Sequence, residues 1–501
     1  MMNYLYTCNR KEKIFFFFSI VLIVFLFMWN FYTLQYTPIP WLDEVYFASV
    51  TYSFMHGDGF TLGLGLGENV YHYGPVYFLL TSLSSLIGGF NMISFRIVGL
   101  LFSFAVAFMV YRILKLKSIN PFVACAVVFL LLFDQLFIYC SHMGRMDLVA
   151  AFFVMIAFYV YEQQKQILNT KGVVIIATCF LLAVMTTARV AITAIPLGLA
   201  IFISMVKGKE WRKLFLLMII PLVGLLVWIF LSYGSVSEFV DYFTKPTEKT
   251  PNQNFFQRFV GGTFDISPNH YPLVLLALIT LVHSIKYKYF KEIYLYVCTI
   301  LLFYLVVHGT NNVYSIMILP YYFIIIGKGL GRALENRSEN KEWFGAMIIV
   351  MLICVVINIG VFMVKWLLIE SSKEYRDGRL MTEWIGKNIP AGTIVLGSDI
   401  YYYACMSNNC SFKSLDQIYS TDEGTLAYIE KTRPVYLLYS DEEGTPEGKR
   451  IKELIKAELV AHYEPVADVN WLDMLTAKIG LINHSTYEGS LYRIIYKDKI
   501  K

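Results

Sequence analysis

Charged residues are scarce in this chain. They make up 16% of the 501 residues, whereas hydrophobic residues make up 57% and the mean hydropathy is +0.55. Because a soluble domain carries roughly 25% charged residues, this composition excludes an ordinary soluble protein and indicates a polytopic membrane protein. The net charge of +5 is small and is explained by the sorting of Lys and Arg between the two sides of a membrane. We therefore predict no nucleic-acid partner.

Several sequence signals are also missing. The first apolar run, residues 14–32, is too long for a secretory signal and no small-residue cleavage site follows it, so we expect it to remain as a membrane span. The basic connections between apolar runs contain no Gly-rich phosphate loop, which argues against a nucleotide-using site on that side. There is no internal repeat and no long low-complexity segment.

Cysteine is infrequent, with eight residues in the chain. Six of them lie in or beside apolar runs, where we expect them to be packing residues. The other two, Cys405 and Cys410, flank a Met-Ser-Asn-Asn sequence in the polar C-terminal part. Metal binding and a disulfide are the alternatives there. We favour the disulfide, because no second Cys pair or His cluster follows.

Lys and Arg are absent from residues 41–95, yet this stretch contains Asp43, Glu44, Asp58 and Glu68. An adjacent acidic pair at a membrane edge is costly unless it is solvated, partnered or used. Two interpretations of Asp43 and Glu44 stay open from the residues alone. They belong either to a solvated interfacial loop or to a catalytic site that faces an aqueous cleft.

The apolar runs predict a mainly α-helical protein with about eleven transmembrane helices. Basic residues cluster in alternate connections, and those before the first run place the N-terminus in the cytoplasm. Residues 75–88 are apolar but short, which favours an interfacial or re-entrant helix. The predicted spans are residues 14–32, 94–114, 121–140, 148–161, 173–187, 190–206, 214–233, 271–285, 293–307, 316–326 and 344–368.

The composition becomes that of a soluble domain after Glu370. We therefore divide the chain into a transmembrane domain, residues 1–369, and a small α/β domain, residues 370–501, of ordinary domain size. An odd number of spans places this second domain on the external side. We expect strands at residues 393–396, 435–439 and 491–496, with helices at 375–388, 425–431 and 449–457.

The predicted external side holds carboxylates, cations and histidines together. This mixture suits a general base beside an anionic leaving group, because a phosphate prefers Arg or protonated His as partners and a hydroxyl nucleophile needs a base. The set is Asp43, Glu44, Asp58, Glu68, His72, His142, Arg145, Asp147, Arg189, Arg258, His308 and Tyr314.

The order of several short motifs resembles that of a known family. They are Asp43-Glu44 after the first span, then Tyr71 to Phe78, Phe95 to Leu100, Arg145-Met146-Asp147 and Thr186 to Arg189. Over residues 14–330 the chain resembles the membrane-embedded GT-C glycosyltransferases. It is most similar to the bacterial group akin to protein O-mannosyltransferases and the aminoarabinose transferases of lipid A. The C-terminal domain matches this group in its placement only.

The resemblance implies a glycosyltransferase that moves a sugar from a polyprenyl-phosphate donor to an acceptor hydroxyl on the external face, with inversion. It implies catalytic roles for Asp43, as the base, and for Glu44 and Asp147. The acceptor is a glycan, a lipid or a protein, and the location is the bacterial cytoplasmic (inner) membrane, with the C-terminal domain in the periplasm. We assign Arg189, Arg145 and His72 to the donor phosphate, and Tyr314, His308 and Arg258 to substrate binding.

Four of these residues also have a purely structural interpretation. Asp147 can pair locally with Arg145, Arg189 can be an interfacial arginine that extends to the water, and Tyr314 can anchor the interface. His72 can pack its own loop. Since the phosphate leaving group is already ionised, we predict that no metal is essential, although Asp43 and Asp147 can share a divalent ion.

Three other functions were compared with this one. An O-antigen ligase or polymerase would centre on Arg and His in a large external connection, and residues 234–270 contain Arg258 and His270. A transporter of lipid-linked sugars would show inverted repeats and charges at mid-span. A receptor would bind its ligand through the external domain alone.

Overall fold

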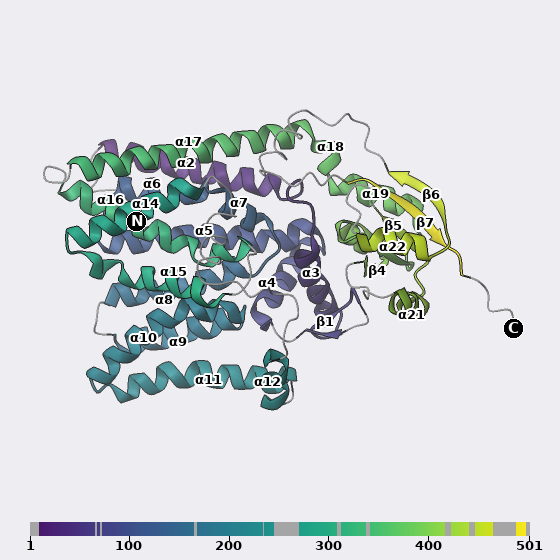
Figure 1. Cartoon of the computed structure of the whole chain (residues 1–501), viewed down its shortest axis with the longest axis horizontal. Coiled ribbons are helices and arrows are strands. Elements are labelled where there is room, and N and C mark those ends of the chain that lie inside the picture. The colour runs from purple at the N-terminus through teal and green to yellow at the C-terminus, as the bar shows by residue number, and fades with distance from the viewer. Residues whose placement is uncertain are drawn as a thin grey trace.

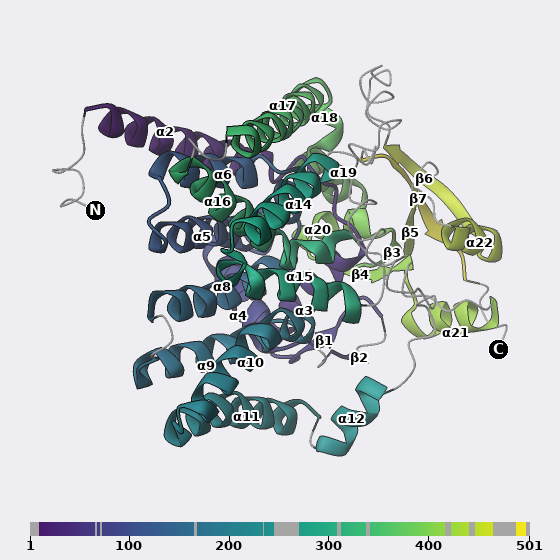
Figure 2. The same ribbon diagram turned by 60° about the vertical axis from the view of Figure 1, so that its left-hand side comes forward.

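The computed structural model describes residues 10–65, 68–70, 73–164, 168–233, 235–244, 270–307, 312–336, 341–415, 422–439, 446–463 and 487–496. Long helices form a bundle, and a small sheet domain lies at one end of it; Figure 2 shows the same arrangement from another side (Figures 1 and 2). The bundle helices are α2 (Arg10–Thr33), α5 (Met92–Leu116), α6 (Pro121–Leu132), α7 (Gln135–His142), α8 (Asp147–Gln164), α9 (Thr170–Val184), α10 (Ala191–Lys207), α11 (Trp211–Tyr233), α14 (Tyr271–Lys286), α15 (Tyr294–Val306), α16 (Leu319–Glu335) and α17 (Lys341–Ser371).

Each predicted span corresponds to one helix or to one broken pair, so the mainly helical membrane class is confirmed. Among the described residues, five helices are long and apolar enough to cross a membrane: Ile14–Thr33, Met92–Leu116, Ala188–Lys207, Trp211–Leu231 and Lys341–Ser371. Other apolar helices are shorter, from 10 to 17 residues. The count of eleven spans therefore stays a prediction.

The outer helices present apolar side chains to the surroundings. In the 18-residue apolar stretch taken from each helix, only 17% of α2 and 22% of α11 is buried inside the protein. Phe17 and Phe18 are 64% exposed, and Leu231 is 77% exposed. Water would disfavour so much apolar surface, whereas lipid tails would cover it. This surface is therefore that of a membrane protein.

One predicted span, residues 121–140, is broken. The helices α6 and α7 meet at an angle of 58°, and Asp134 lies between them. Its side chain accepts a hydrogen bond from the Phe137 amide at 3.1 Å and so caps α7. Its other oxygen lies 2.9 Å from Nε2 of buried His270, at the start of α14. The two oxygens of Asp134 are thus occupied at the break by the helix cap and by the contact with His270.

Short elements connect the bundle to the sheet domain. They are α3 (Leu42–Met55), the hairpin β1 (Thr61–Leu62) and β2 (Glu68–Asn69), and α4 (Pro75–Gly88). Figure 1 shows α3, α4 and β1 at the end of the bundle that faces the sheet. Asp43 and Glu44 stand in the first turn of α3, so the solvated interfacial loop considered for them is a helix. The helix α4 is 14 residues long, and its interfacial or re-entrant placement stays a prediction.

The C-terminal part contains a five-stranded sheet of order β4-β3-β5-β7-β6. Strand β3 (Ile394–Gly397) is parallel to β4 (Ser411–Ser414) and β5 (Tyr436–Tyr439), and β7 (Gly489–Ile494) is antiparallel to β5 and β6 (Ala457–Tyr463). Strands β3, β5 and β7 were predicted, whereas β4 and β6 were missed. The helices are α18 (Lys373–Arg376), α19 (Gly378–Asn388), α20 (Tyr402–Ser407), α21 (Asp422–Thr432) and α22 (Pro446–Leu454).

Hydrogen bonds hold this sheet against the β1–β2 connection. Lys413 donates to the carbonyl oxygens of Gly63 and Gly65, both at 2.8 Å. The backbone amide of Ser414 and the hydroxyl of Tyr428 both donate to Leu64 O, at 3.1 and 3.2 Å. The sheet domain is thus fixed to the segment that follows α3. The domain boundary at residue 370 stays a prediction.

An ionic network closes the bundle at the ends of α5 and α8 that lie away from the sheet. Glu162 accepts from Lys117 at 2.8 Å, and from Lys328 and the Tyr296 hydroxyl at 3.0 Å each. Lys328 is fully buried in α16 and also donates to Glu292 O at 2.8 Å. These basic residues belong to the predicted cytoplasmic connections, and the structure brings them to one end of the bundle.

Candidate active site

The two adjacent carboxylates of α3 point in different directions. Successive side chains on a helix are about 100° apart, so Asp43 and Glu44 cannot share one partner. The Asp43 side chain is 32% exposed, whereas Glu44 is completely buried. The N-terminal turn of a helix also favours negative charge. The pair therefore separates into one accessible carboxylate and one internal carboxylate.

Asp43 belongs to a bridge of two carboxylates joined by one guanidinium. Arg145 Nη1 donates to Asp43 Oδ2, and Arg145 Nε donates to Asp147 Oδ2 at 2.7 Å. Arg145 and Asp147 are each 4% exposed. Burial alone would lower the pKa of Arg145, but Asp147 and Asp43 outweigh it and hold this pKa well above the usual range. The guanidinium thus stays charged and fixes both acids.

A glycine before α8 and the N-terminus of α8 itself position this bridge. A Cβ on Gly144 would overlap the ring of Phe95 and come within 3.0 Å of Glu44 Cγ, so only glycine lets the turn before α8 approach α3 this closely. Asp147 then begins α8, where the helix N-terminus favours its charge. The predicted group of Asp43, Arg145 and Asp147 is therefore brought together. The local pair of Arg145 with Asp147 and the longer contact with Asp43 coexist.

A second cation, Arg189, lies near the Asp43–Arg145–Asp147 bridge. The ring of Tyr314 lies between two guanidinium groups, with its centroid 5.1 Å from Arg145 Cζ and 4.2 Å from Arg189 Cζ. Tyr314 comes from η4 (Asn312–Met317) and Arg189 from η1 (Ala188–Val190). Arg189 is exposed, and among the described residues it makes no ion pair. Its hydrogen-bond donors are therefore available to an anion, whereas those of Arg145 are engaged by carboxylates.

Tyr73 adds a protonated hydroxyl to this group, and sequence reasoning did not single it out. Burial, together with Tyr314 and Asp43 and against the effect of Arg189, raises the pKa of Tyr73 to about 12. The next residue, Gly74, approaches the Met185 backbone so closely that a Cβ would overlap it, and Val76 N donates to Met185 O at 3.3 Å. This contact joins the start of α4 to the end of α9, just before Arg189.

Glu44 faces a different partner, which was not predicted. Arg96 Nε and Nη2 donate to the two oxygens of Glu44 at 2.7 Å each, and Arg96 Nη1 donates to Leu34 O at 2.7 Å. Both side chains are fully buried, and Tyr403 of the C-terminal domain adds a hydroxyl at 3.3 Å from Glu44 Oε1. The expected direct catalytic role of Glu44 does not fit this geometry. Its carboxylate joins α2, α5 and the sheet domain instead. Arg96, the first basic residue after Asp43, was the available signal for this pair.

The other predicted site residues divide into two groups. His72, Arg258 and His308 lie outside the described residues. Cys405 and Cys410 are both free thiols, so the predicted disulfide is not formed in this structure. The backbone amide of Cys410 donates to Cys405 O at 3.0 Å in a tight turn, and burial raises the pKa of the Cys405 thiol well above its usual value. A buried neutral thiol is a poor partner for disulfide exchange.

Comparison of the whole fold with solved structures gives clear matches. No protein-family model matches the chain, and no curated protein sequence matches it significantly. ArnT from Cupriavidus metallidurans in the apo state superposes with a TM-score of 0.65 at 12% identity, over 96% of this chain and 98% of that one. The chain has the ArnT fold. The predicted GT-C fold is thereby confirmed.

Two further structures share this fold. ArnT bound to undecaprenyl phosphate gives a TM-score of 0.60 at 14% identity, over 94% of this chain and 97% of that chain. The Archaeoglobus fulgidus oligosaccharyltransferase, in complex with Zn and sulfate, gives 0.51 at 10% identity, over 89% of this chain and 72% of that chain. The ArnT fold therefore extends across both the helix bundle and the sheet domain of this chain.

The Zn in the oligosaccharyltransferase raises the question of whether Asp43 and Asp147 suit a metal. In this chain the Arg145 guanidinium already lies between the two carboxylates. No cluster of three or more His, Cys, Asp or Glu side chains suited to a metal occurs in the part of the chain that the structure describes. Arg145 engages one oxygen of each carboxylate, Oδ2 in both. The shared divalent ion that the sequence allowed therefore stays a prediction.

Proposed function

We propose that this chain is a glycosyltransferase that moves a sugar from a polyprenyl-phosphate donor to an acceptor hydroxyl, with inversion at the anomeric carbon. The single observation that supports it best is the partly exposed Asp43 carboxylate in one group with Arg189, an exposed cation that makes no ion pair among the described residues. A base and an exposed cation in one group at the end of an apolar bundle are what transfer from a lipid phosphate needs.

The donor would be held by its two chemically different ends. Its apolar tail would lie along the lipid-facing helices, and its phosphate would accept hydrogen bonds from Arg189 at the bundle end. That ArnT binds undecaprenyl phosphate supports this choice of donor. Packing of Arg189 on Tyr314 holds the guanidinium plane in one orientation. Tyr314 would therefore act in positioning the phosphate rather than as a simple interfacial anchor.

The reaction would proceed by direct displacement. Asp43 would accept the proton of the acceptor hydroxyl while that oxygen forms a bond to the anomeric carbon. The bond between this carbon and the phosphate oxygen would break, and its electron pair would leave with the polyprenyl phosphate. Arg189 would stabilise the charge that gathers on the leaving phosphate. No step in this sequence requires a metal.

Arg145, Asp147 and Tyr73 would support this chemistry. Arg145 orients the Asp43 carboxylate through a direct hydrogen bond, and Asp147 holds Arg145 in place. Tyr73 stays protonated at neutral pH because its pKa is about 12, so its hydroxyl can donate to a substrate oxygen. Arg145 would contribute to the donor phosphate site by its charge.

The predicted topology completes the proposal. The site would open on the external face of a bacterial cytoplasmic membrane, with the N-terminus inside and residues 370–501 in the periplasm. The acceptor would be a glycan, a lipid or a protein. The ligase-like alternative is less favoured, because His270 is 4% exposed and lies against Asp134 at the α6–α7 break.

Release of polyprenyl phosphate tests the function directly. Purified full-length protein would be mixed with polyprenyl-phosphate hexoses and pentoses and with candidate acceptors, and the free lipid phosphate and glycosylated product measured by mass spectrometry. We expect turnover of at least one donor and a loss of 100-fold or more in Asp43→Asn, since a general base contributes about 10²- to 10⁴-fold. Asp58→Asn is the matched control, because Asp58 is an exposed acid of the same connection.

Two results would contradict the proposal. One is a well-folded protein that releases no lipid phosphate from any donor of the panel. The other is an Asp43→Asn variant that keeps the rate of the Asp58→Asn control.

A further inference from the structure

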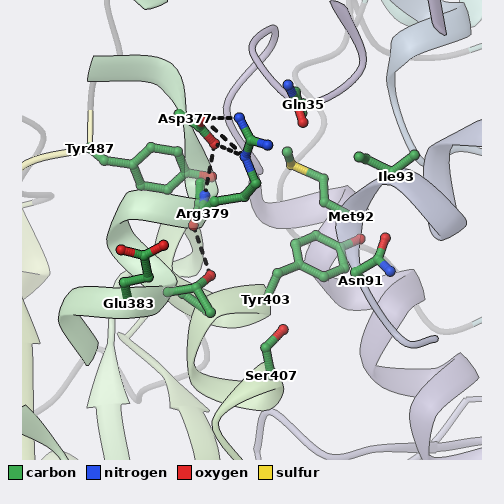
Figure 3. Close-up of a pocket in the computed structure, with 13 residues that line it drawn as sticks. Gln35, Asn91, Met92, Ile93, Asp377, Arg379, Glu383, Tyr403, Ser407 and Tyr487 are labelled. Atoms are coloured by element: carbon green, nitrogen blue, oxygen red, sulfur yellow. Dashed lines mark hydrogen bonds and ion pairs between the residues drawn. The ribbon is translucent and has the colours of Figure 1, made fainter. Parts of the chain in front are cut away.

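A cavity lies next to Tyr403, the residue that donates to Glu44. It has a volume of about 490 Å³, within the range of small-ligand pockets. Figure 3 shows that its walls come from two parts of the chain. Gln35 and the first residues of α5 form one wall, and residues 377–383 of α19 and its N-cap, residues of α20 and Tyr487 form the other. Nothing in the mechanism above uses this cavity.

The polar groups of the cavity are suited to hydroxyl ligands. Gln35, Glu383 and Ser407 line it, and their side chains make no hydrogen bond to other described residues. Gln35 and Ser407 can each donate and accept, and Glu383 accepts. A ligand that carries many hydroxyl groups needs this combination of donors and acceptors.

Aromatic side chains supply the apolar part of the lining. Tyr403 is 6% exposed and Tyr487 is 4% exposed, so both are held rigidly with part of each at the cavity. Figure 3 shows the two rings on opposite sides of Arg379. A tyrosine ring offers an apolar face beside a polar hydroxyl. Sugars have the matching character, because their C–H faces are apolar and their edges carry hydroxyls.

The charges of the cavity disfavour an anionic ligand. Among the described residues that line it, Arg379 is the one base, and Asp377 engages this guanidinium by hydrogen bonds of 2.6 to 3.1 Å (Figure 3). Glu383 then leaves one unbalanced negative charge in this described lining. A phosphate or an acidic sugar would meet this charge, whereas a neutral or amino sugar would not be repelled by it.

We infer that this cavity binds a neutral or amino sugar and serves as an anchoring subsite for a glycan acceptor. Its role as an acceptor subsite rests on the proposed function. Asp43, Arg145 and Arg189 are not among the described residues that line the cavity, so the sugar bound here is not the one that reacts. The sugar would instead hold a longer glycan through a distant unit. Tyr403, which lines the cavity and donates to Glu44, joins the subsite to the helix that carries Asp43.

Titration with tetrasaccharides of different charge tests this inference. Purified full-length protein would be kept in a detergent without a sugar headgroup, and binding of maltotetraose, the glucosamine tetramer and tetragalacturonate measured by calorimetry and saturation-transfer NMR. We expect saturable binding of the neutral and the cationic sugars and at least tenfold weaker binding of the acidic one. Glu383→Gln should reduce the preference for the cationic sugar by about two- to fivefold, as expected for one exposed charge.

A variant that fills the cavity locates the binding. Ser407 is exposed at the end of α20, so Ser407→Trp should fold normally, as a thermal scan would verify, and bind at least tenfold more weakly. Ser411→Trp is the control, because Ser411 is also exposed but lies on strand β4 outside the cavity. Equal binding in Ser407→Trp and wild type would overturn the inference. So would a lack of saturable binding, equal affinity for the acidic sugar, or a preference for peptides.

The same preparation separates this inference from the proposed function. Asp43→Asn should lose transfer and keep sugar binding. Sugar binding without turnover of any donor would refute the transferase and leave the sugar site standing. Donor turnover that does not change when Ser407→Trp removes sugar binding would refute the acceptor role of the cavity alone.

Discussion

The buried pair of Glu44 and Arg96 gives the sharpest test of what stabilises this fold. Arg96→Met would remove three hydrogen bonds of 2.7 Å, two to Glu44 and one to Leu34 O. It would leave the Glu44 charge without a partner in a site that is 0% exposed. Breaking such a pair costs about 3 to 5 kcal/mol. Glu44→Leu should cost a similar amount, because it leaves Arg96 charged and buried.

The double variant is the informative one. Glu44→Leu with Arg96→Met removes both charges, and an apolar replacement of a buried pair is often about neutral. We therefore expect it to recover most of the lost free energy of unfolding. The assay is unfolding of the purified protein in mixed micelles with increasing SDS, followed by tryptophan fluorescence and analysed as a double-mutant cycle.

A surface pair supplies the control. Lys213 and Glu210 are 2.7 Å apart but 21% and 36% exposed, so Lys213→Met should cost less than about 1 kcal/mol. If the double variant were as unstable as the sum of the two single variants, the pair would contribute no coupling. The explanation of why Glu44 is buried here would then be wrong.

Three further predictions concern the site and the topology. Arg145→Ala should lower the rate of transfer at least 100-fold and let the two freed carboxylates bind Mn²⁺, which EPR would detect. EDTA should leave the wild type active. Restoration of the activity of an EDTA-treated wild type by Zn²⁺ would contradict this prediction. Tyr73→Phe should slow transfer without changing the shape of the pH–rate profile below pH 10, because a hydroxyl with a pKa of about 12 stays protonated there; loss of an alkaline limb in the variant would contradict this. Finally, a membrane-impermeant maleimide should label Glu374→Cys but not Lys207→Cys in intact cells, because both positions are exposed but lie on opposite sides of the membrane in the predicted topology. The reverse labelling pattern would show that the predicted topology is inverted.

Much of the fold follows from hydropathy and charge. Apolar runs near membrane length identified the bundle helices, since a bilayer requires such runs. The positions of Lys and Arg then assigned each helix end to one side of the membrane. The structure brings Lys117, Lys328 and their partner Glu162 to the end of the bundle opposite Asp43. The break at Asp134 was not predictable in this way. One carboxylate in an apolar run does not show that a distant histidine, His270, pairs with it.

The side of the membrane on which the site residues lie was predictable, but among their contacts only the local Arg145–Asp147 pair was. Asp43, Arg145, Asp147, Arg189 and Tyr314 were all expected on one side, and the structure brings them into one group. Which of Asp43 and Glu44 is accessible and which is internal depends on the rotation of α3 about its axis and on which distant side chains contact each residue. Tyr403 comes from the C-terminal part of the chain, and no local pattern connects it to Glu44. Strand β4, which carries Lys413, was missed because its four residues show no clear apolar alternation.

The two ionic groups at opposite ends of α5 and α8 have a mechanical consequence. Glu162 ties the far ends of these helices to α16, and Arg96 and Asp147 tie their near ends to α3. Helices that are held at both ends by ionic contacts form a rigid frame. Lipids of different tail length would therefore enter and leave along the outer helices without disturbing the spacing between Asp43 and Arg145.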